Sequence, residues 1–311
     1  MSGKKATRRA YGEYLVHLGK KYPQIVVLDA DLADATFTKL FKEEFPERFF
    51  DCGIAEANMI DMAAGLSTMG LIPFASTFAV FGAGRAYEQI RNGIAYSGLN
   101  VKLAFSHAGV STGPDGGSHQ SIEDIALMRV IPGMTVIVPA DEKETIHAMD
   151  AALEIDGPVY IRLARMETDI LEDHPFQVGH ACVLKHGSDV ALICCGITVD
   201  QCLAAARTLE KDGISAAVIN MHTIKPLDAE TVLEYAKKCK KIITVEDHSV
   251  IGGLGDAVAS VLCGRSAAAF EKLGVQDRFG QSATPDELMH EYGIDADCII
   301  AAAKRSEGPG M

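Results

Sequence analysis

Short apolar runs alternate along the chain with longer segments in which apolar residues recur every three or four positions. Runs such as 25–28 and 190–194 are typical of strands that are buried on both faces. The segments 6–20 and 142–154 have instead the spacing of amphipathic helices. Because strands alternate with helices throughout, the pattern predicts an α/β fold of mostly parallel sheets flanked by helices.

The predicted elements fall into two consecutive groups. Strands are expected at 25–28, 71–76, 101–105, 135–138, 159–163, 190–194, 216–219 and 242–245, and helices at 6–20, 78–95, 122–130, 142–154, 199–211, 229–238, 254–262 and 285–292. The polar stretch 167–175 indicates a linker. We therefore expect two domains, residues 1–170 and 171–311, since a domain averages about 150 residues. The tail 305–311 is expected to be frayed.

The segment 59–84 is the part of the sequence that could be mistaken for a membrane span. It carries a single charge, Asp61, and is long enough to cross a bilayer. Gly65, Gly70 and Pro73 interrupt it, so that it divides into a helix, a strand and a helix. We expect this segment to belong to the buried core of the first domain.

Composition and charge narrow the classes of partner. The chain is 48% hydrophobic and 23% charged, as in a globular protein with a full core. Its net charge of −13 argues against nucleic acid and anionic membranes as partners. A phosphate-bearing substrate would need a local cluster of Arg and His residues. The chain does not open on a basic segment followed by an apolar one, so we expect no secretory signal and a cytoplasmic location.

The cysteine pattern does not indicate a C-x-x-C site, and the glycine pattern does not indicate a dinucleotide-binding site. Eight Cys residues occur without a C-x-x-C pair, which is typical of buried thiols in a reducing cytosol. Cys194 and Cys195 are adjacent in an apolar run, so they are expected on opposite faces of a strand. The Gly-rich fragments 82–84 and 252–255 lack the third Gly of a dinucleotide fingerprint and predict turns or helix starts.

Residues 51–59, Asp-Cys-Gly-Ile-Ala-Glu-Ala-Asn-Met, place one carboxyl, Glu56, at the start of an apolar helix. Desolvation disfavours a charged carboxylate, whereas a helix N-terminus favours it. A carboxyl held between these two influences can share a proton with a partner base. Taken alone, the pattern favours a simpler interpretation, an acid that complements the helix dipole.

The pattern G-I-A-E-A-N-M-x-x-x-A-A-G-L at 53–66 resembles the pyrimidine-binding domain of transketolases, which use thiamine diphosphate. The resemblance extends over nearly the whole chain, with later motifs in family order. It implies that Glu56 is catalytic, because the matching Glu hydrogen-bonds the aminopyrimidine ring. It also implies that Ile54 and Asp31 lie near the cofactor, although helix capping is an alternative role for Asp31.

The stretch 106–120 places two His and one Asp in a Gly-rich loop after a predicted strand, where binding sites of parallel sheets lie. A surface loop with solvated histidines fits its composition about equally well. A metal site of His107, Asp115 and His119 is less favoured, because the spacing matches no standard zinc pattern, and we predict none. The lack of G-x-S-x-G around Ser118 excludes a serine hydrolase.

This loop resembles the substrate loop of transketolases. The resemblance implies that His107 contacts the phosphate end of the substrate, Asp115 a sugar hydroxyl, and His119 the reacting oxygen, as a catalytic residue. The sequence departs from the usual G-E-D-G-P-T-H-Q at three positions, which hold Pro114, Gly117 and Ser118. These departures affect the shape of the sugar pocket.

Phe78 and Phe81 are expected to share one helix face, because they are three residues apart. Such a pair is usually plain core. The resemblance implies instead that both pack on the aminopyrimidine, with Phe81 stacked on the ring. Gly84 stands where transketolases often carry Tyr.

Two arginines match those that grip the sugar phosphate in the family. Arg8 and Arg165 would bind phosphate oxygens bidentately. The alternative for each is a solvated surface arginine, especially for Arg8 near the terminus. Ala35 occupies the position of a phosphate-contacting Ser, so one donor is lost.

No Gly-Asp-Gly, the family's diphosphate- and Mg²⁺-binding motif, occurs in the sequence. The resemblance therefore implies the C-terminal half of a split transketolase. An N-terminal subunit would hold the diphosphate and most of the contacts to Mg²⁺, and a homodimeric core would become a heterotetramer when complete. The expected reaction transfers a two-carbon ketol unit from a ketose phosphate to an aldose phosphate, as in the pentose phosphate pathway.

Three alternatives remain open at this point. They are the β subunit of a 2-oxoacid dehydrogenase, half of an enzyme like 1-deoxyxylulose-5-phosphate synthase, and a regulatory subunit that kept the fold without the cofactor. The loop from His107 to His119 favours a transketolase over the dehydrogenase. The presence of Glu56 and His119 argues against the regulatory subunit.

Overall fold

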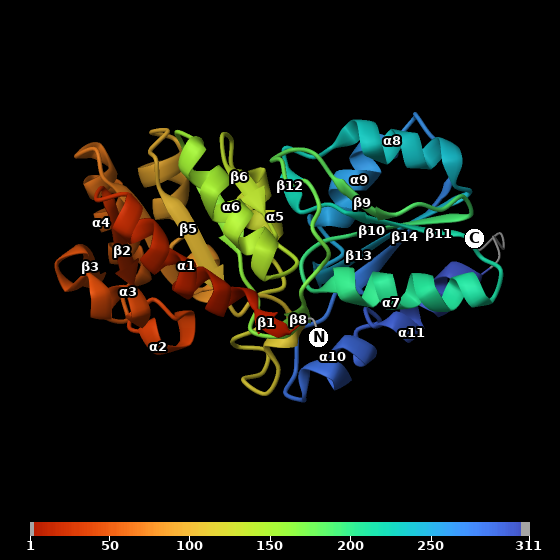
Figure 1. Cartoon of the computed structure of the whole chain (residues 1–311), viewed down its shortest axis with the longest axis horizontal. Coiled ribbons are helices and arrows are strands. Elements are labelled where there is room, and N and C mark those ends of the chain that lie inside the picture. Colours follow the sequence, from red (N-terminus) through yellow and green to blue (C-terminus); the bar gives the residue numbers. More distant parts are fainter. Residues whose placement is uncertain (1–2, 306–311) are drawn as a thin grey trace.

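Two sheets lie side by side along the long axis of the molecule, each flanked by helices (Figure 1). The computed structural model describes residues 3–305. The N-terminal part of the chain builds most of a seven-stranded sheet, and the C-terminal part builds a five-stranded one. The predicted α/β fold of two consecutive domains is therefore confirmed.

The first sheet has the strand order β12-β6-β7-β5-β4-β2-β3 and is parallel apart from β12. Its parallel strands are β2 (Ile25–Asp29), β3 (Phe49–Asp51), β4 (Ile72–Phe78), β5 (Lys102–Ser106), β6 (Thr135–Ile137) and β7 (Val159–Arg162). Around it lie α1 (Thr7–Lys21), α2 (Ala33–Thr36), α3 (Lys39–Glu44), α4 (Glu56–Thr68), α5 (Asp124–Val130) and α6 (Glu142–Glu154), with the 3-10 turns η1 (Pro46–Arg48) and η4 (Val110–Thr112).

The second sheet has the order β14-β13-β10-β11-β9, in which β9 alone is antiparallel. Its strands are β9 (Cys182–Lys185), β10 (Val190–Cys194), β11 (Ala216–Asn220), β13 (Lys241–Ser249) and β14 (Ala269–Val275). The helices of this part are α7 (Thr198–Lys211), α8 (Ala229–Lys238), α9 (Leu254–Leu262), α10 (Pro285–Glu291) and α11 (Ala296–Lys304). Each helix predicted here is present, within one residue at either end.

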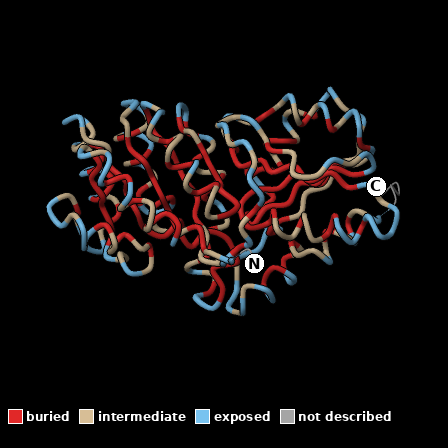
Figure 2. The backbone as a smooth tube through the Cα atoms, viewed as in Figure 1, coloured by how far each residue is buried: buried red, intermediate tan, exposed pale blue. Residues whose placement is uncertain are grey.

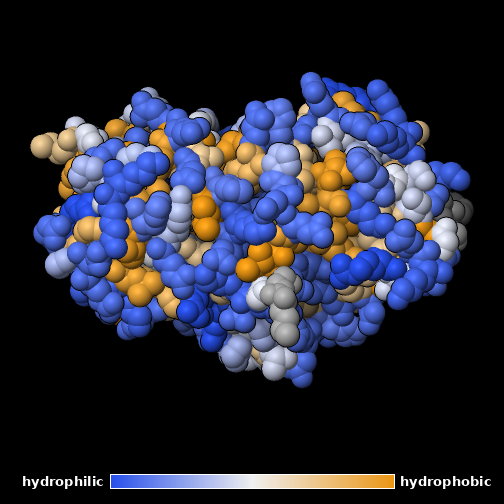
Figure 3. Space-filling view, viewed as in Figure 1, coloured by the Kyte–Doolittle hydropathy of each residue, from blue (hydrophilic) through white to orange (hydrophobic). Residues whose placement is uncertain are grey.

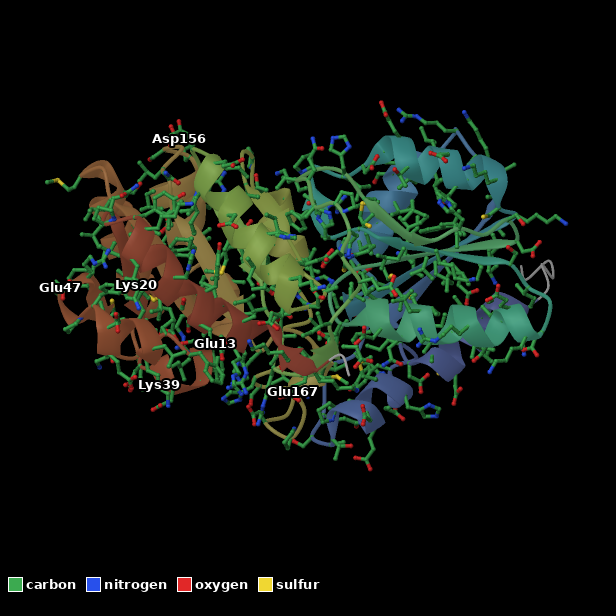
Figure 4. The ribbon with its side chains drawn as sticks, in the orientation of Figure 1. Glu13, Lys20, Lys39, Glu47, Asp156 and Glu167 are labelled. Carbon is green, nitrogen blue, oxygen red and sulfur yellow. The ribbon has the colours of Figure 1, made fainter. Side chains whose placement is uncertain are left out.

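Long-range pairing modifies the predicted linker. The first three residues of the stretch 167–175 form β8 (Glu167–Asp169), which pairs with β1 (Lys4–Ala6) beside the N-terminus; Glu167 is labelled in Figure 4. The linker prediction is wrong for these residues, because the Thr168 side chain is buried and donates to the Ala140 carbonyl. The chain also returns later, since β12 (Thr223–Lys225) pairs with β6 at the edge of the first sheet.

The helix predicted at 78–95 takes another form. Phe78 is the last residue of β4, and the rest of the segment contains the wide π-helical turns η2 (Val80–Arg85) and η3 (Gln89–Ala95). The segment 59–84 is a helix, a strand and a helical segment, as predicted. No helix among residues 3–305 is both long and apolar enough to cross a membrane. Residues 306–311 of the predicted frayed tail lie outside the described residues.

Burial follows the strands of both sheets, whereas exposed residues lie on the outer helices and loops (Figure 2). In β10, Val190, Leu192 and Cys194 pack with α7, while Ala191 and Ile193 join a core that continues under both sheets. Cys195 faces this second side, so the prediction of opposite faces is confirmed. Five of the eight free thiols are buried, but Cys52 and Cys298 are half-buried and Cys263 is exposed. The face shown in Figure 3 is mostly hydrophilic, with apolar patches near its middle.

Candidate active site

Residues able to do chemistry collect at the carboxyl edge of the first sheet. Strands β3, β2, β4 and β5 are neighbours and run parallel, so their carboxyl ends meet at one edge. Phe78 ends β4, His107 directly follows β5, and Glu56 begins the helix that follows β3. The fold thus brings together residues from three separate stretches of the sequence.

Four rings form one cluster at this edge. The Phe78 ring stacks on His107 with the centroids 3.7 Å apart, and on Phe81 with the centroids 5.8 Å apart. His119 stands edge-on to Phe81 at 5.3 Å. The prediction that Phe78 and Phe81 share a helix face is wrong, because Phe78 belongs to the strand. The two rings stack nevertheless, since η2 begins directly after β4 and Ala79.

Glu56 is buried beneath an arginine that the sequence motif did not indicate. Its side chain is 1% exposed, and its Oε2 lies 2.8 Å from Nη1 of Arg85, whose own side chain is 55% exposed. The Arg85 guanidinium also lies 5.0 Å from the centre of the Phe81 ring, within cation–π range. Arg85 therefore contacts both the Glu56 carboxylate and the aromatic face.

A sequence signal for Arg85 existed. Between Asp61 and Glu88 the chain holds no other charged residue. A lone charge in a long apolar segment needs a partner or a route to solvent. Arg85 has both in the structure, since its side chain is half-exposed and its partner is Glu56 at the start of α4.

Two arginines lie near the His107 end of the ring cluster. Arg8 Nη1 is 3.3 Å from Nε2 of His107 and donates to the Ala35 carbonyl at 2.7 Å. Arg165 Nη1 lies 2.9 Å from Oδ1 of Asp115. Ala35, which stands where the family has a phosphate-contacting Ser, thus still orients Arg8 through its backbone carbonyl. Burial, and then the charge of Arg165, lower the pKa of Arg8.

His107 is a neutral ring between these charges. Burial, followed by the charges of Arg8 and Arg165, lowers its pKa to about 3. Because a guanidinium can only donate, Nε2 of His107 accepts from Arg8. Its Nδ1 then carries the proton and donates to Ser106 Oγ at 2.8 Å. The residue holds the arginine in place as an acceptor and adds no positive charge of its own.

The loop departs from the family pattern where it meets the second domain. A Cβ at Gly117 would lie 2.6 Å from the carbonyl oxygen of Gly280, so a side chain there would displace backbone. Ser118 Oγ lies 3.0 Å from Nδ1 of His119, within hydrogen-bond distance. Pro114 and Asp115 are exposed. Gly117 and Ser118 therefore fit contacts within this chain.

Two predicted site residues are not joined to the cluster. Ile54 is 75% exposed on the loop before α4. Asp31 is exposed and, among the described residues, caps no helix: Leu32 is the N-cap of α2 and has no side-chain bond. The buried Asp29 instead accepts from the Leu32 N–H at 2.6 Å and from Thr36 Oγ1. Burial raises the pKa of Asp29 to about 6.

The carboxyl edge offers one open acceptor beside aromatic rings. Asp115 pairs with Arg165, while His107 and His119 pack against phenyl rings, and among the described residues these three do not form a group close enough to hold one metal ion. Among the described residues, only Arg85 bonds the Glu56 carboxylate, through Oε2, and Oε1 has no partner there. An open acceptor next to stacked aromatic faces suits a flat ring that has a hydrogen-bond donor at its edge.

Two family models match this chain. Residues 3–169 match the model described as "Transketolase, pyrimidine binding domain", and residues 179–299 match "Transketolase, C-terminal domain". Together they extend over both sheets. The first match alone includes more than half of the chain.

Three similar proteins match this chain over nearly the whole length of both partners. The "Putative transketolase C-terminal section" of Methanocaldococcus jannaschii is 48% identical over 301 residues, 95% of this chain and 94% of that protein. The "6-deoxy-6-sulfo-D-fructose transketolase subunit" of Clostridium sp. (strain MSTE9) is 43% identical over 298 residues, 95% and 92% of the two chains. The solved "Split gene transketolase, inactive beta4 tetramer" has a TM-score of 0.86 and 50% identity, over 97% of this chain and 98% of its own.

Proposed function

This chain belongs to the transketolase family, and we propose that it is the C-terminal subunit of a split transketolase that moves a two-carbon ketol unit from a ketose phosphate to an aldose phosphate. Residues 1–170 would be its pyrimidine-binding domain and 171–311 its C-terminal domain. One observation carries the proposal. A buried carboxylate, an aromatic face and an arginine bonded to a neutral histidine lie next to one another at a single sheet edge.

Thiamine diphosphate, on which transketolases depend, supplies a nucleophilic carbon and an electron sink when bound. In this chain Glu56 would accept and return a proton at the pyrimidine ring, while Phe78 and Phe81 pack against it. Arg85 would keep its bond to Glu56 Oε2, because Oε1 has no partner among the described residues. Asp31 and Ile54 would lie at the margin of this pocket. Diphosphate and Mg²⁺ would be held mainly by the partner chain.

The substrate would lie beside the two arginines near His107. Arg8 and Arg165 are the cations of this pocket and would bind the anionic end, with His107 orienting Arg8. Asp115 would exchange its bond to Arg165 for a sugar hydroxyl, and His119 would donate to the reacting oxygen. One relative is named as a subunit of a 6-deoxy-6-sulfo-D-fructose transketolase, so a sulfonate is the alternative anion for this chain. We propose phosphate for this chain, since two guanidinium groups suit its oxygens.

Mixing the subunits tests the proposal. The purified chain should fold but show no ketol transfer with thiamine diphosphate and Mg²⁺. Activity should appear when the diphosphate-binding subunit is added, and the titration should saturate near equimolar. A relative described as an inactive tetramer supports this expectation. Full turnover by the isolated chain would overturn the split-enzyme proposal, and inactivity of the saturated mixture would overturn the transketolase assignment.

A further inference from the structure

One carboxylate of the second domain reaches into the loop 106–120. Asp247, 3% exposed, lies near the end of β13. It accepts the backbone N–H of Val110 at 2.8 Å and that of Ser111 at 3.3 Å. These residues begin η4, the turn that lies between His107 and His119. A residue far away in the sequence therefore supplies the acceptor for this turn.

The backbone at Gly109 makes room for the carboxylate. Its φ of +82° is in the left-handed region that favours glycine. A Cβ built on Gly109 would lie 2.1 Å from Oδ2 of Asp247, closer than any side chain tolerates. The loop and the strand are therefore shaped around this one contact.

Buried groups of the first domain hold Asp247 in place. Arg162 donates to the Asp247 carbonyl at 2.9 Å and pairs with Asp124 through bonds of 2.7 and 3.1 Å. Tyr160 adds a bond of 2.6 Å to Asp124. Satisfied buried networks of this kind are rigid. Asp247 is thus a fixed point against which the loop is held.

The turn contacts residues that we assign to the substrate. Thr112 Oγ1 donates to the His107 carbonyl at 2.8 Å, and the Thr112 carbonyl accepts from Arg165 at 3.0 Å. Gln120 Nε2 closes the loop with a bond of 3.0 Å to the Gly113 carbonyl. A displaced turn would therefore move His107 and Arg165 relative to each other.

We propose that Asp247 is a positioning residue for the anionic end of the substrate, an inference that rests on the proposed function. Asp247 fixes the turn 110–112, and through it the spacing of His107 and Arg165. Displacements of about 1 Å in such groups lower rates by as much as a hundredfold. The C-terminal domain thereby acts on the reaction without touching the substrate.

Asp247→Asn is the test variant. The amide keeps one oxygen that can accept a backbone N–H, but its NH₂ group faces the other N–H of the Val110–Ser111 pair, so one of the two bonds is lost. In the chain alone, hydrogen exchange should accelerate at the amides of Val110 and Ser111 and stay unchanged in β10. In the complex with the partner subunit, kcat/KM for a ketose phosphate should fall about tenfold, as expected for a lost charge-assisted bond. The Kd for thiamine diphosphate should not change, because Glu56 and Phe81 lie on other elements.

Asp228→Asn is the matched control. Asp228 is a buried N-cap of the same domain that accepts from the N–H groups of Thr231 and Ala181 at 2.9 and 2.8 Å. Asp228→Asn should lower the melting temperature, but it should change neither the hydrogen exchange of the Val110 and Ser111 amides nor kcat/KM. Gly109→Ala, which pushes a methyl group against Asp247, should reproduce both effects of Asp247→Asn and replaces that variant if it does not fold.

Unchanged exchange at Val110 and Ser111 would overturn the inference, as would faster exchange with unchanged kcat/KM. An equal loss in the Asp228 variant would also overturn it, because the effect would then be general destabilisation. If the wild-type complex transfers no ketol unit, the proposed function fails, whereas the exchange result still decides whether Asp247 fixes the turn.

Discussion

Glu56 and Glu246 are two buried carboxyls near helix starts, one in each domain, and they differ in what surrounds them. Glu56 begins α4 and, among the described residues, bonds only the half-exposed Arg85. Glu246 of β13 accepts the N–H of Leu254 at 2.7 Å and that of Gly255 at 2.8 Å, at the start of α9. One carboxylate keeps an acceptor for a ligand, whereas both oxygens of the other are used by the protein.

The residues around Glu56 and around Glu246 differ in the same way, in how far the protein itself uses their polar groups. In the first domain, rings, arginines and a carboxylate lie close together, and the arginine that bonds the carboxylate is half-exposed. In the second, Glu246, Asp247 and His248 are buried and bond backbone groups. Burial raises the pKa of Glu246 to about 7 and lowers that of His248 to about 4. Residue type alone therefore does not mark a site; an acceptor without a protein partner does.

The strongest test of this contrast is Glu56→Gln. The amide has nearly the same shape but cannot pass a proton to a ring nitrogen, so turnover of the complete complex should fall about 10²–10⁴-fold, the range of general acid–base catalysis. The circular dichroism spectrum should match that of the wild type. Turnover close to wild type, at saturating thiamine diphosphate, would remove Glu56 from its proposed role.

A smaller effect is expected at the anionic end of the same edge. Arg165→Ala should raise KM for sugar phosphates about tenfold or more, because a charge-assisted bond contributes roughly 1.5–3 kcal/mol. KM for unphosphorylated analogues should change little. Arg9→Ala is the control, since Arg9 is exposed and paired with Glu13 at 2.9 Å. Equal losses for both kinds of substrate would place Arg165 outside the phosphate pocket.

The smallest effect on turnover is expected for the second-domain acid. Glu246→Gln leaves one of two backbone N–H groups facing an amide NH₂, so urea unfolding should show a loss of about 1–3 kcal/mol in stability. Turnover per folded complex should stay at the wild-type level, because Glu246 supports α9 and does not reach the first-domain edge. A loss of turnover without a loss of stability would contradict the contrast between the two acids.

Local patterns predicted much of this molecule. Helix α6 has its predicted bounds, because Asp141 caps it through the Glu144 N–H and its buried residues Thr145, Ala148, Met149 and Ala152 have helical spacing. Resemblance singled out Glu56, Phe78, Phe81, His107 and His119, and the last four share one cluster of rings. The Gly-rich fragment 252–255 leads into α9 as expected, with Gly253 making room for Glu246.

Other features were decided only by tertiary packing. The pairing of β12 with the first sheet, the bond between Glu56 and Arg85, and the hold of Asp247 on Val110 all join residues that are distant in the sequence. Periodicity and capping depend on neighbours within a few positions, so the sequence by itself determined the elements, the class of fold and the motif residues. Which acceptors stay open depends on how those elements meet in space, because a partner supplied by another element leaves no local pattern.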